Sequence, residues 1–416
     1  MMKEEIINNL DNPKQLEKLY RDNKTTFKRA FNVIYPDYME KPAAQFWNER
    51  LNYENEEIYW GFNKELIFTM FAVIIAGLLA EIPNFANIDP ENFYPKNISF
   101  IVFPLMIAFF FWVHKIQSRK IIATISAIII ISAIYINFLP NNTESQTFIL
   151  ACIHLPLFLW TVLGFSYISN NLNNYQRRLD FLRFNGDFII MTGIILIAGA
   201  ALTGITIGLF SLIDINIEKF YFQHIVVCGL AASPIVGTYL VYTNPHLVNK
   251  ISPVIAKVFT PLVLVMLVVY LLAIIGTGKD PFNDRDFLLV FNLLLIGVMA
   301  IIFFSIAETA KNSTTMMGIL LLLALSLVTV MVNGIALSAI LYRISEWGIT
   351  PNRLAVLVSN ILILINLIIV AYRLFKSVKN RNQIEHVERS IASFLPVYGL
   401  WALLVTFIFP LLFNFK

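Results

Sequence analysis

The chain has 416 residues, of which 57% are hydrophobic and only 14% charged, and its formal net charge is +4. Soluble domains carry nearer one quarter charged residues, so this composition argues against a soluble protein. No basic stripe of the kind that neutralises phosphates is present, which argues against nucleic acid as a partner. The polar residues gather in the first 65 positions, and long apolar runs follow.

Residues 1–65 form a polar segment with helical patterning. Asn12 followed by Pro13 suits the N-cap and first position of a helix. Apolar residues then recur at helical spacing, at Leu16, Leu19, Tyr20, Phe27, Phe31 and Ile34. We expect a small helical unit on the cytoplasmic side. It serves either as a cap on the membrane part or as a docking site for a partner protein.

Residues 66–416 hold apolar runs that each approach the ~20 residues needed to cross a bilayer core. We expect about eleven spans, at 66–82, 98–113, 121–139, 147–168, 188–213, 225–243, 254–276, 287–307, 317–342, 353–373 and 394–413. The predicted fold is therefore an all-α, polytopic helix bundle in a lipid bilayer.

Loop charges predict the orientation of these spans. With the N-terminal segment in the cytoplasm, most Lys and Arg of the short loops fall on the cytoplasmic side, and the acidic residues lean to the other side. No apolar stretch near Met1 resembles a signal peptide, so membrane targeting rests on 66–82. We expect a multi-pass protein of the bacterial inner membrane, with Lys416 outside.

The sequence lacks the common motifs for nucleotide binding, hydrolysis, metal binding and redox chemistry. It holds no phosphate loop, no Gly-x-Ser-x-Gly elbow, no His-Glu-x-x-His and no Cys-x-x-Cys. The tract 385–389 is best explained as a solvated charged helix, and 175–184 as an interfacial helix. The sequence thus predicts no cofactor and no metal, and it does not favour an enzyme.

Polar side chains within the expected spans are the candidates for an intramembrane site. His154 lies near mid-membrane, two residues before Pro156, which frees a backbone carbonyl one turn earlier. Asparagines recur at similar depth, at Asn292, Asn333, Asn360 and Asn366. Hydrogen bonds between helices explain all five. Alternatively, they line a wet path for a proton or a solute.

Small residues at a spacing of four mark close helix packing in two spans. Gly204 and Gly208 form one such pair, and Gly229, Ser233 and Gly237 repeat the spacing in the next span.

The loop from Arg343 to Arg353 is the most distinctive string. Gly348 suits a helix end, Thr350 a cap and Pro351 the first position of the next helix. Glu346 is spaced to pair with Arg343 and, across the turn, with Arg353. We expect an ordered hairpin with a charged cluster in an outer loop, which is structural or gates access from outside.

This string, followed by Leu354-Ala355-Val356-Leu357, resembles a tract of the bacterial membrane protein family called domain of unknown function 4153. The tract 16–21 resembles the same family more weakly. The resemblance implies an integral membrane protein and supplies no catalytic residues.

Two hypotheses of function remain. The first is a transporter or permease-like protein for a small solute or ion, favoured by spans broken at Pro156, Pro234 and Pro261 and by the deep asparagines. The alternative is a membrane-embedded scaffold that binds a partner through its N-terminal segment. An enzyme acting on lipid is disfavoured, because no paired acids or histidine-rich metal set lies at one membrane face.

Overall fold

The computed structural model describes residues 2–22, 24–52, 64–116, 118–142, 144–168, 174–211, 215–244, 251–277, 285–311, 316–379 and 383–415. Every regular element in this part of the chain is a helix. The chain divides into two compact units, Met1–Trp60 and Gly61–Lys416, each with a hydrophobic core of its own.

The first unit is built from short helices. They are α1 (Met2–Asn8), α2 (Pro13–Asp22), α3 (Lys24–Ile34), the 3-10 helix η1 (Tyr35–Tyr38) and α4 (Pro42–Asn52). The backbone N–H of Gln15 donates to Asn12 Oδ1 at 3.3 Å, so the predicted N-cap of α2 is confirmed. The apolar faces of the helices meet in one core, formed by Ile6, Leu10, Leu16, Phe27, Ala30, Phe31, Ile34, Ala44, Trp47 and Leu51.

An arginine ties α4 to α2 at the edge of this core. The Arg50 guanidinium carbon lies 4.7 Å from the centre of the Trp47 ring, and Nη2 lies 2.8 Å from Glu17 Oε2. Arg21 Nε donates to the other oxygen of Glu17 at 2.8 Å. The Arg21 hydrogen bond, aided by Arg50, lowers the pKa of Glu17 below its usual 4.5.

The second unit is a bundle of longer apolar helices. In chain order they are α5 (Lys64–Ala80), α6 (Ile82–Ala86), α7 (Pro90–Val113), α8 (Arg119–Phe138), α9 (Gln146–Ile168), α10 (Tyr175–Ser211), α11 (Glu218–Phe220), the π-helix η2 (Tyr221–Val226), α12 (Val227–Thr243), α14 (Ile251–Thr277), α15 (Arg285–Lys311), α16 (Met316–Trp347), α17 (Pro351–Lys379), α18 (Ile384–Leu403), the π-helix η4 (Leu404–Ile408) and α19 (Phe409–Leu412).

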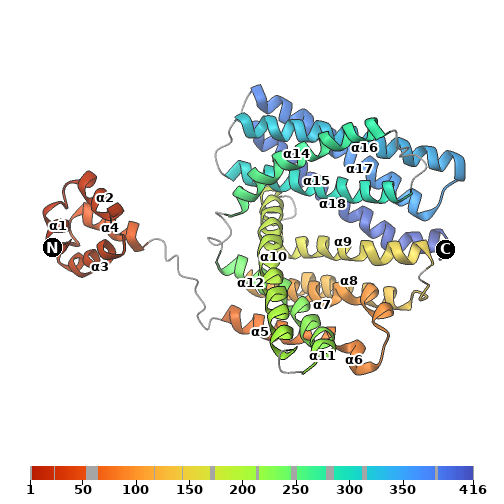
Figure 1. Cartoon of the computed structure of the whole chain (residues 1–416), viewed down its shortest axis with the longest axis horizontal. Helices are drawn as coiled ribbons and strands as arrows, with labels where there is room; N and C mark the ends of the chain where they lie inside the picture. Colours follow the sequence, from red (N-terminus) through yellow and green to blue (C-terminus); the bar gives the residue numbers. More distant parts are fainter. Residues whose placement is uncertain are drawn as a thin grey trace. The chain divides into compact units, whose positions relative to one another are not determined.

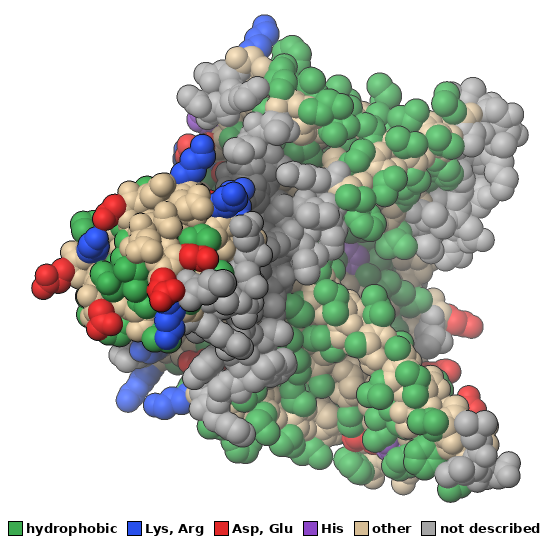
Figure 2. All heavy atoms as spheres, turned by 60° about the vertical axis from the view of Figure 1, so that its left-hand side comes forward, with side chains coloured by type: hydrophobic (Ala, Val, Ile, Leu, Met, Phe, Trp, Pro, Cys, Tyr) green, Lys and Arg blue, Asp and Glu red, His purple; other side chains and the backbone are tan. Residues whose placement is uncertain are grey.

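Eight helices of the described chain are long and apolar enough to cross a membrane. Their side chains suit lipid, because large hydrophobic residues such as Phe138 (84% exposed) and Ile197 (74% exposed) lie on the surface. Figure 2 shows hydrophobic side chains spread over the visible described surface of the bundle. The chain is therefore a membrane protein with several helical spans.

The predicted count of about eleven spans is not confirmed by the length and apolar composition of the described helices. Each predicted span overlaps a helix, but α5 has only 17 residues. The described apolar parts of α14 and α15 are the shorter stretches Val258–Leu272 and Phe291–Ala307.

Helix α10 differs from the prediction and from its neighbours. It runs unbroken for 37 residues, so the predicted interfacial helix at 175–184 is its first part rather than a separate element. At 1.5 Å per residue it is about 55 Å long, well beyond the ~30 Å of a bilayer core. Figure 1 shows α10 lying across the helices of the bundle instead of along them.

Two large hydrophobic clusters form the interior of the bundle. One joins α7, α8, α9 and α12, and the other joins α14, α15, α16, α17 and α18. The first part of α10 belongs to both, because Phe181 packs in the first cluster and Leu182 in the second. Helix α10 therefore holds the two halves of the bundle together.

Candidate functional site

Asn333 of α16 and Asn360 of α17 meet between these two helices. Asn333 Nδ2 donates to the backbone carbonyl of Asn360 at 3.2 Å, and both side chains are fully buried. Asn333 Oδ1 and Asn360 Nδ2 are also buried, and neither finds a hydrogen-bond partner among the described residues. A buried amide atom without a partner costs about 1–3 kcal/mol, so this contact is only half explained by helix packing.

Asn366 forms a second polar contact, on another face of α17. Its Nδ2 donates to the Tyr398 hydroxyl of α18 at 2.8 Å, and that hydroxyl lies 3.4 Å from Met299 Sδ of α15. Asn366 is fully buried, and its Oδ1 has no partner in the described part of the chain. Side chains from α15, α17 and α18 thus form a small polar cluster within an apolar interior.

His154 lies apart from these contacts, in α9. It is half-buried, and its Nδ1 lies 2.9 Å from the carbonyl of Leu150, one turn earlier in the same helix. Within the described residues, no hydrogen bond joins His154 to any of the candidate asparagines. Asn292 is half-buried in α15. The structure therefore distributes the predicted site over several places.

The loop between α16 and α17 is an ordered hairpin. Gly348 has φ +75° and its N–H donates to the carbonyl of Ile344 at 2.9 Å, which ends α16 with the left-handed residue that glycine tolerates. Thr350 Oγ1 accepts the N–H of Arg353 at 3.3 Å, and Pro351 opens α17. The N–H of Asn352 donates to Gln146 at the start of α9, which fastens the hairpin to the bundle.

The predicted ion pairs of this hairpin are not formed. Glu346 is exposed, and no ion pair joins it to Arg343 or Arg353 in the described structure. Arg353 Nη1 instead donates to the carbonyls of Trp347 and Gly348, both at 2.7 Å. These carbonyls lie at the end of α16, where they lack helical donors and where the negative end of the helix dipole favours a cation.

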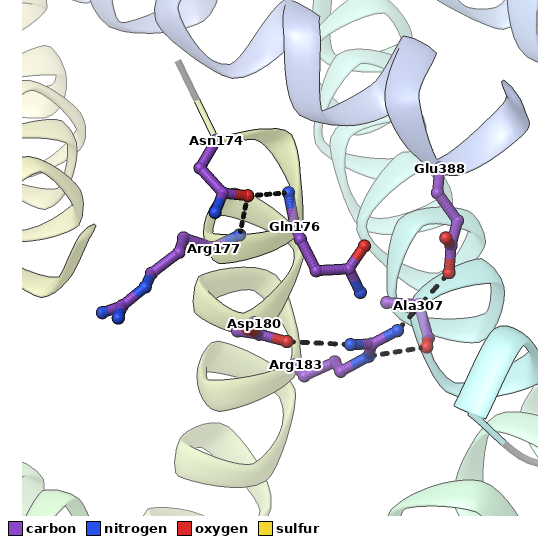
Figure 3. Close-up of polar contacts among 7 residues, drawn as sticks. All are labelled: Asn174, Gln176, Arg177, Asp180, Arg183, Ala307 and Glu388. Atoms are coloured by element: carbon purple, nitrogen blue, oxygen red, sulfur yellow. Dashed lines mark hydrogen bonds and ion pairs between the residues drawn. The ribbon is translucent and has the colours of Figure 1, made fainter. Parts of the chain in front are cut away.

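The most buried ion pair among the described residues was not predicted from the sequence. Arg183 of α10 donates from Nη1 to Asp180 at 2.9 Å and from Nη2 to Glu388 of α18 at 3.4 Å (Figure 3). Its Nε donates to the carbonyl of Ala307 in α15 at 2.9 Å. Only 6% of the Glu388 side chain is exposed, so the expectation that 385–389 is a solvated helix is wrong at this position.

More contacts surround this network along α10 and α18. The Tyr175 hydroxyl donates to Glu385, and the Arg389 guanidinium lies over the Tyr175 ring at 5.7 Å. Arg177, by contrast, points away from the network, and its backbone N–H is capped by Asn174 (Figure 3). The start of α10 is therefore fixed against α15 and α18 by polar contacts as well as by apolar packing.

A second unpredicted cluster lies where α5 ends and η2 begins. Glu81 has only 8% of its side chain exposed, and its Oε2 lies 2.8 Å from His224 Nδ1. The same oxygen accepts from Asn84 at 2.8 Å, and Cys228 Sγ lies 3.8 Å from Oε1. Glu81 is thus a buried acid with specific partners.

Lys96 is a third buried polar group that was not among the candidate site residues. It lies inside α7 with 4% exposure, and its Nζ donates to the carbonyl of Leu139 at 2.8 Å. The ammonium also lies 5.3 Å from the centre of the Phe148 ring. Lys96 therefore caps the end of α8, where the last carbonyls of a helix lack donors.

Glycines separate two kinds of helix surface. A Cβ at Gly237 would lie 2.5 Å from Thr192 Oγ1, so the predicted close packing of α12 is seen there. No atom of the described residues lies within 4 Å of a Cβ at Gly204, Gly208 or Gly229, so close packing is not found there in the described structure.

The described residues include no group of three or more His, Cys, Asp or Glu side chains that could hold a metal ion. No family model, no curated protein and no solved structure matches the chain. Evidence of function therefore rests on the chain's own contacts.

Proposed function

We propose that this chain is a permease-like protein that moves a small solute or ion across the inner membrane. In this proposal about eleven helices cross the bilayer, the first unit lies in the cytoplasm and the C-terminus lies outside. The chain would belong to the multi-spanning family that its 343–357 tract resembles.

One observation carries the proposal: fully buried asparagines on α16 and α17 keep polar atoms that no described group satisfies. Interhelical bonding alone would pair these atoms. Polar groups at this depth are expensive in lipid and are kept where water or a solute meets them. Prolines inside α9, α12 and α14 support the proposal, since each removes one helical hydrogen bond.

Water access at the asparagines tests this function. Asn360 and Asn366 are each replaced by cysteine in a protein whose Cys152 and Cys228 are alanine. Ile363→Cys, an apolar position of α17 that is 3% exposed, is the matched control. Only the thiolate attacks a small water-soluble thiol-specific reagent, and the thiolate forms where water reaches the sulfur. We expect the asparagine positions to react about tenfold faster than the control.

Equal, slow reaction at all three positions would overturn the proposal, because the interior of α17 would then be dry. Labelling is measured in native membranes, and the amount of protein extracted in folded form shows whether each variant is intact.

A scaffold function is the second candidate, and the separate core of Met1–Trp60 favours it. A mere cap on the membrane part would not need a core of its own. Removal of residues 1–52 separates the two functions: transport would survive the deletion, whereas partner binding would not.

A further inference from the structure

At the hairpin between α16 and α17, two arginine side chains lie close to one tryptophan ring. The guanidinium carbons of Arg343 and Arg353 lie 5.4 and 5.7 Å from the centre of the Trp347 ring. Tyr342 meets the same ring edge-on, at 6.2 Å between ring centres. Trp347 is 49% exposed, so the cluster opens to the surroundings of the bundle. We name these four residues the hairpin cluster.

Among the described residues, no acidic side chain neutralises the positive charge of the hairpin cluster. Glu346, the acid within the same loop, is exposed and makes no ion pair with either arginine. Arg353 uses Nη1 on two backbone carbonyls, which leaves its other donors available. Arg343 Nη1 is buried and has no acceptor among the described residues. Arginine keeps its charge at any accessible pH, so the cluster suits an anionic ligand.

The position of the hairpin cluster at the ends of two apolar helices indicates which kind of anion it would meet. Helices α16 and α17 are both long and apolar enough to cross a bilayer, and the cluster lies where one ends and the other begins. Arginine and tryptophan side chains at this level face lipid headgroups. Two guanidinium forks fit the oxygens of a phosphate group better than a single carboxylate.

We propose that the hairpin cluster binds a phosphate group, supplied by the headgroup of an anionic phospholipid or by free inorganic phosphate. Arg343 and Arg353 hold the phosphate oxygens, and the Trp347 ring positions both guanidinium groups at the same hairpin. This site is independent of the asparagines within the bundle and of any transport by them.

Thermal unfolding of the full-length protein in a neutral detergent tests the site. Phosphatidylglycerol, phosphatidylcholine and inorganic phosphate are titrated separately, because a ligand of the folded state raises the unfolding temperature. We expect phosphatidylglycerol to stabilise the protein and phosphatidylcholine, whose choline is cationic, to do so much less. Loss of one guanidinium–phosphate bond in Arg343→Gln should raise the half-saturating concentration about tenfold.

Arg119→Gln is the control, because Arg119 is an exposed arginine at a helix start. It should respond to phosphatidylglycerol as the unaltered protein does. Arg343→Lys keeps the charge without the planar fork and is used if Arg343→Gln does not fold; it should also weaken the response. Stabilisation by inorganic phosphate alone, lost in Arg343→Gln, would support the site and assign it to free phosphate. A response that is unchanged in the Arg343 variants, or equal for both lipids, would overturn the proposal.

Discussion

Arg183 and Glu388 meet across 205 residues of chain, with Nη2 of the arginine 3.4 Å from Oε1 of the glutamate. The Arg183 side chain is 16% exposed and that of Glu388 6%, so both charges are largely removed from water. Each charge is tolerable only while the other is present. The pair therefore fixes the start of α10 to the start of α18.

We predict that Glu388→Gln lowers the stability of the detergent-solubilised protein by roughly 3 kcal/mol, because it leaves the Arg183 charge buried with less compensation. Asp180→Asn removes a partner of the same arginine that is 45% exposed and should cost only about 0–1 kcal/mol. Thermal unfolding followed by tryptophan fluorescence measures both. Equal shifts for the two variants would show that Glu388 is solvated.

The double variant Arg183→Met with Glu388→Leu should recover most of the stability lost in Glu388→Gln, because it removes both buried charges together. A double variant less stable than Glu388→Gln would mean that the bond from Arg183 to the Ala307 carbonyl contributes more than the ion pair.

Replacing glycines by alanine should lower stability where a helix is closely packed and not where its surface is unpacked. A Cβ at Gly399 of α18 would lie 2.4 Å from Thr161 Cγ2, so Gly399→Ala should destabilise the bundle by about 1–3 kcal/mol. Gly204→Ala meets nothing within 4 Å and should be neutral or stabilising, since alanine favours a helix by up to about 1 kcal/mol. Loss of stability in Gly204→Ala would reveal a contact with another molecule.

The hairpin between α16 and α17 should depend on Arg353 and not on Glu346. Arg353→Met removes the donors to the carbonyls of Trp347 and Gly348 and should lower stability by about 1–3 kcal/mol. Glu346→Gln should stay within about 0.5 kcal/mol, as exposed substitutions do. The unfolding temperatures of the two variants, measured in the same detergent, check this order. A larger loss of stability in Glu346→Gln than in Arg353→Met would contradict this and would indicate that Glu346 forms the predicted ion pairs.

The first unit should lose stability at acid pH through Glu17. Because its pKa is lowered in the folded state, its contribution is present above the usual 4.5 and is lost as pH falls further, through the lowered value. Urea unfolding of a 1–52 fragment, followed by Trp47 fluorescence at pH 6 and pH 3, measures this. Glu17→Gln should be less stable than the natural fragment at pH 6 and nearly equal to it at pH 3. A constant difference at both values would contradict the role of its charge.

Cysteine labelling at the start of α8 and in the segment between α8 and α9 should establish the orientation. With Cys152 and Cys228 replaced by alanine, Glu144→Cys should react with an impermeant thiol reagent in intact cells, and Lys120→Cys only after lysis. Both positions are exposed. The opposite pattern would invert the proposed topology.

Hydropathy and helix signals predicted the helices well because they depend on local sequence. The helix start at Pro13 and the turn at Gly348 follow from single residues whose backbone preferences are strong. The unbroken course of α10 was missed because its polar first part and apolar second part suggest two elements.

The site was predicted less well because its contacts join residues far apart in the chain. Asn333 and Asn360 were identified as polar and deep, but their pairing depends on how α16 packs on α17. The burial of Glu388 had a faint signal, since Val387 and Ile391 make one side of α18 apolar. A single sequence does not show that Arg183 arrives beside it.

Consecutive residues of α10, Phe181 and Leu182, pack in different halves of the bundle. One helical turn is thus shared by two cores, so neither half slides past the other while that turn stays seated in both. If the two halves move apart in a functional cycle, α10 must either move as a rigid body with one half or rotate about its own axis. A crosslink between α10 and α18 distinguishes these two motions, because it would block the rotation of α10 and leave its movement together with α18 unaffected.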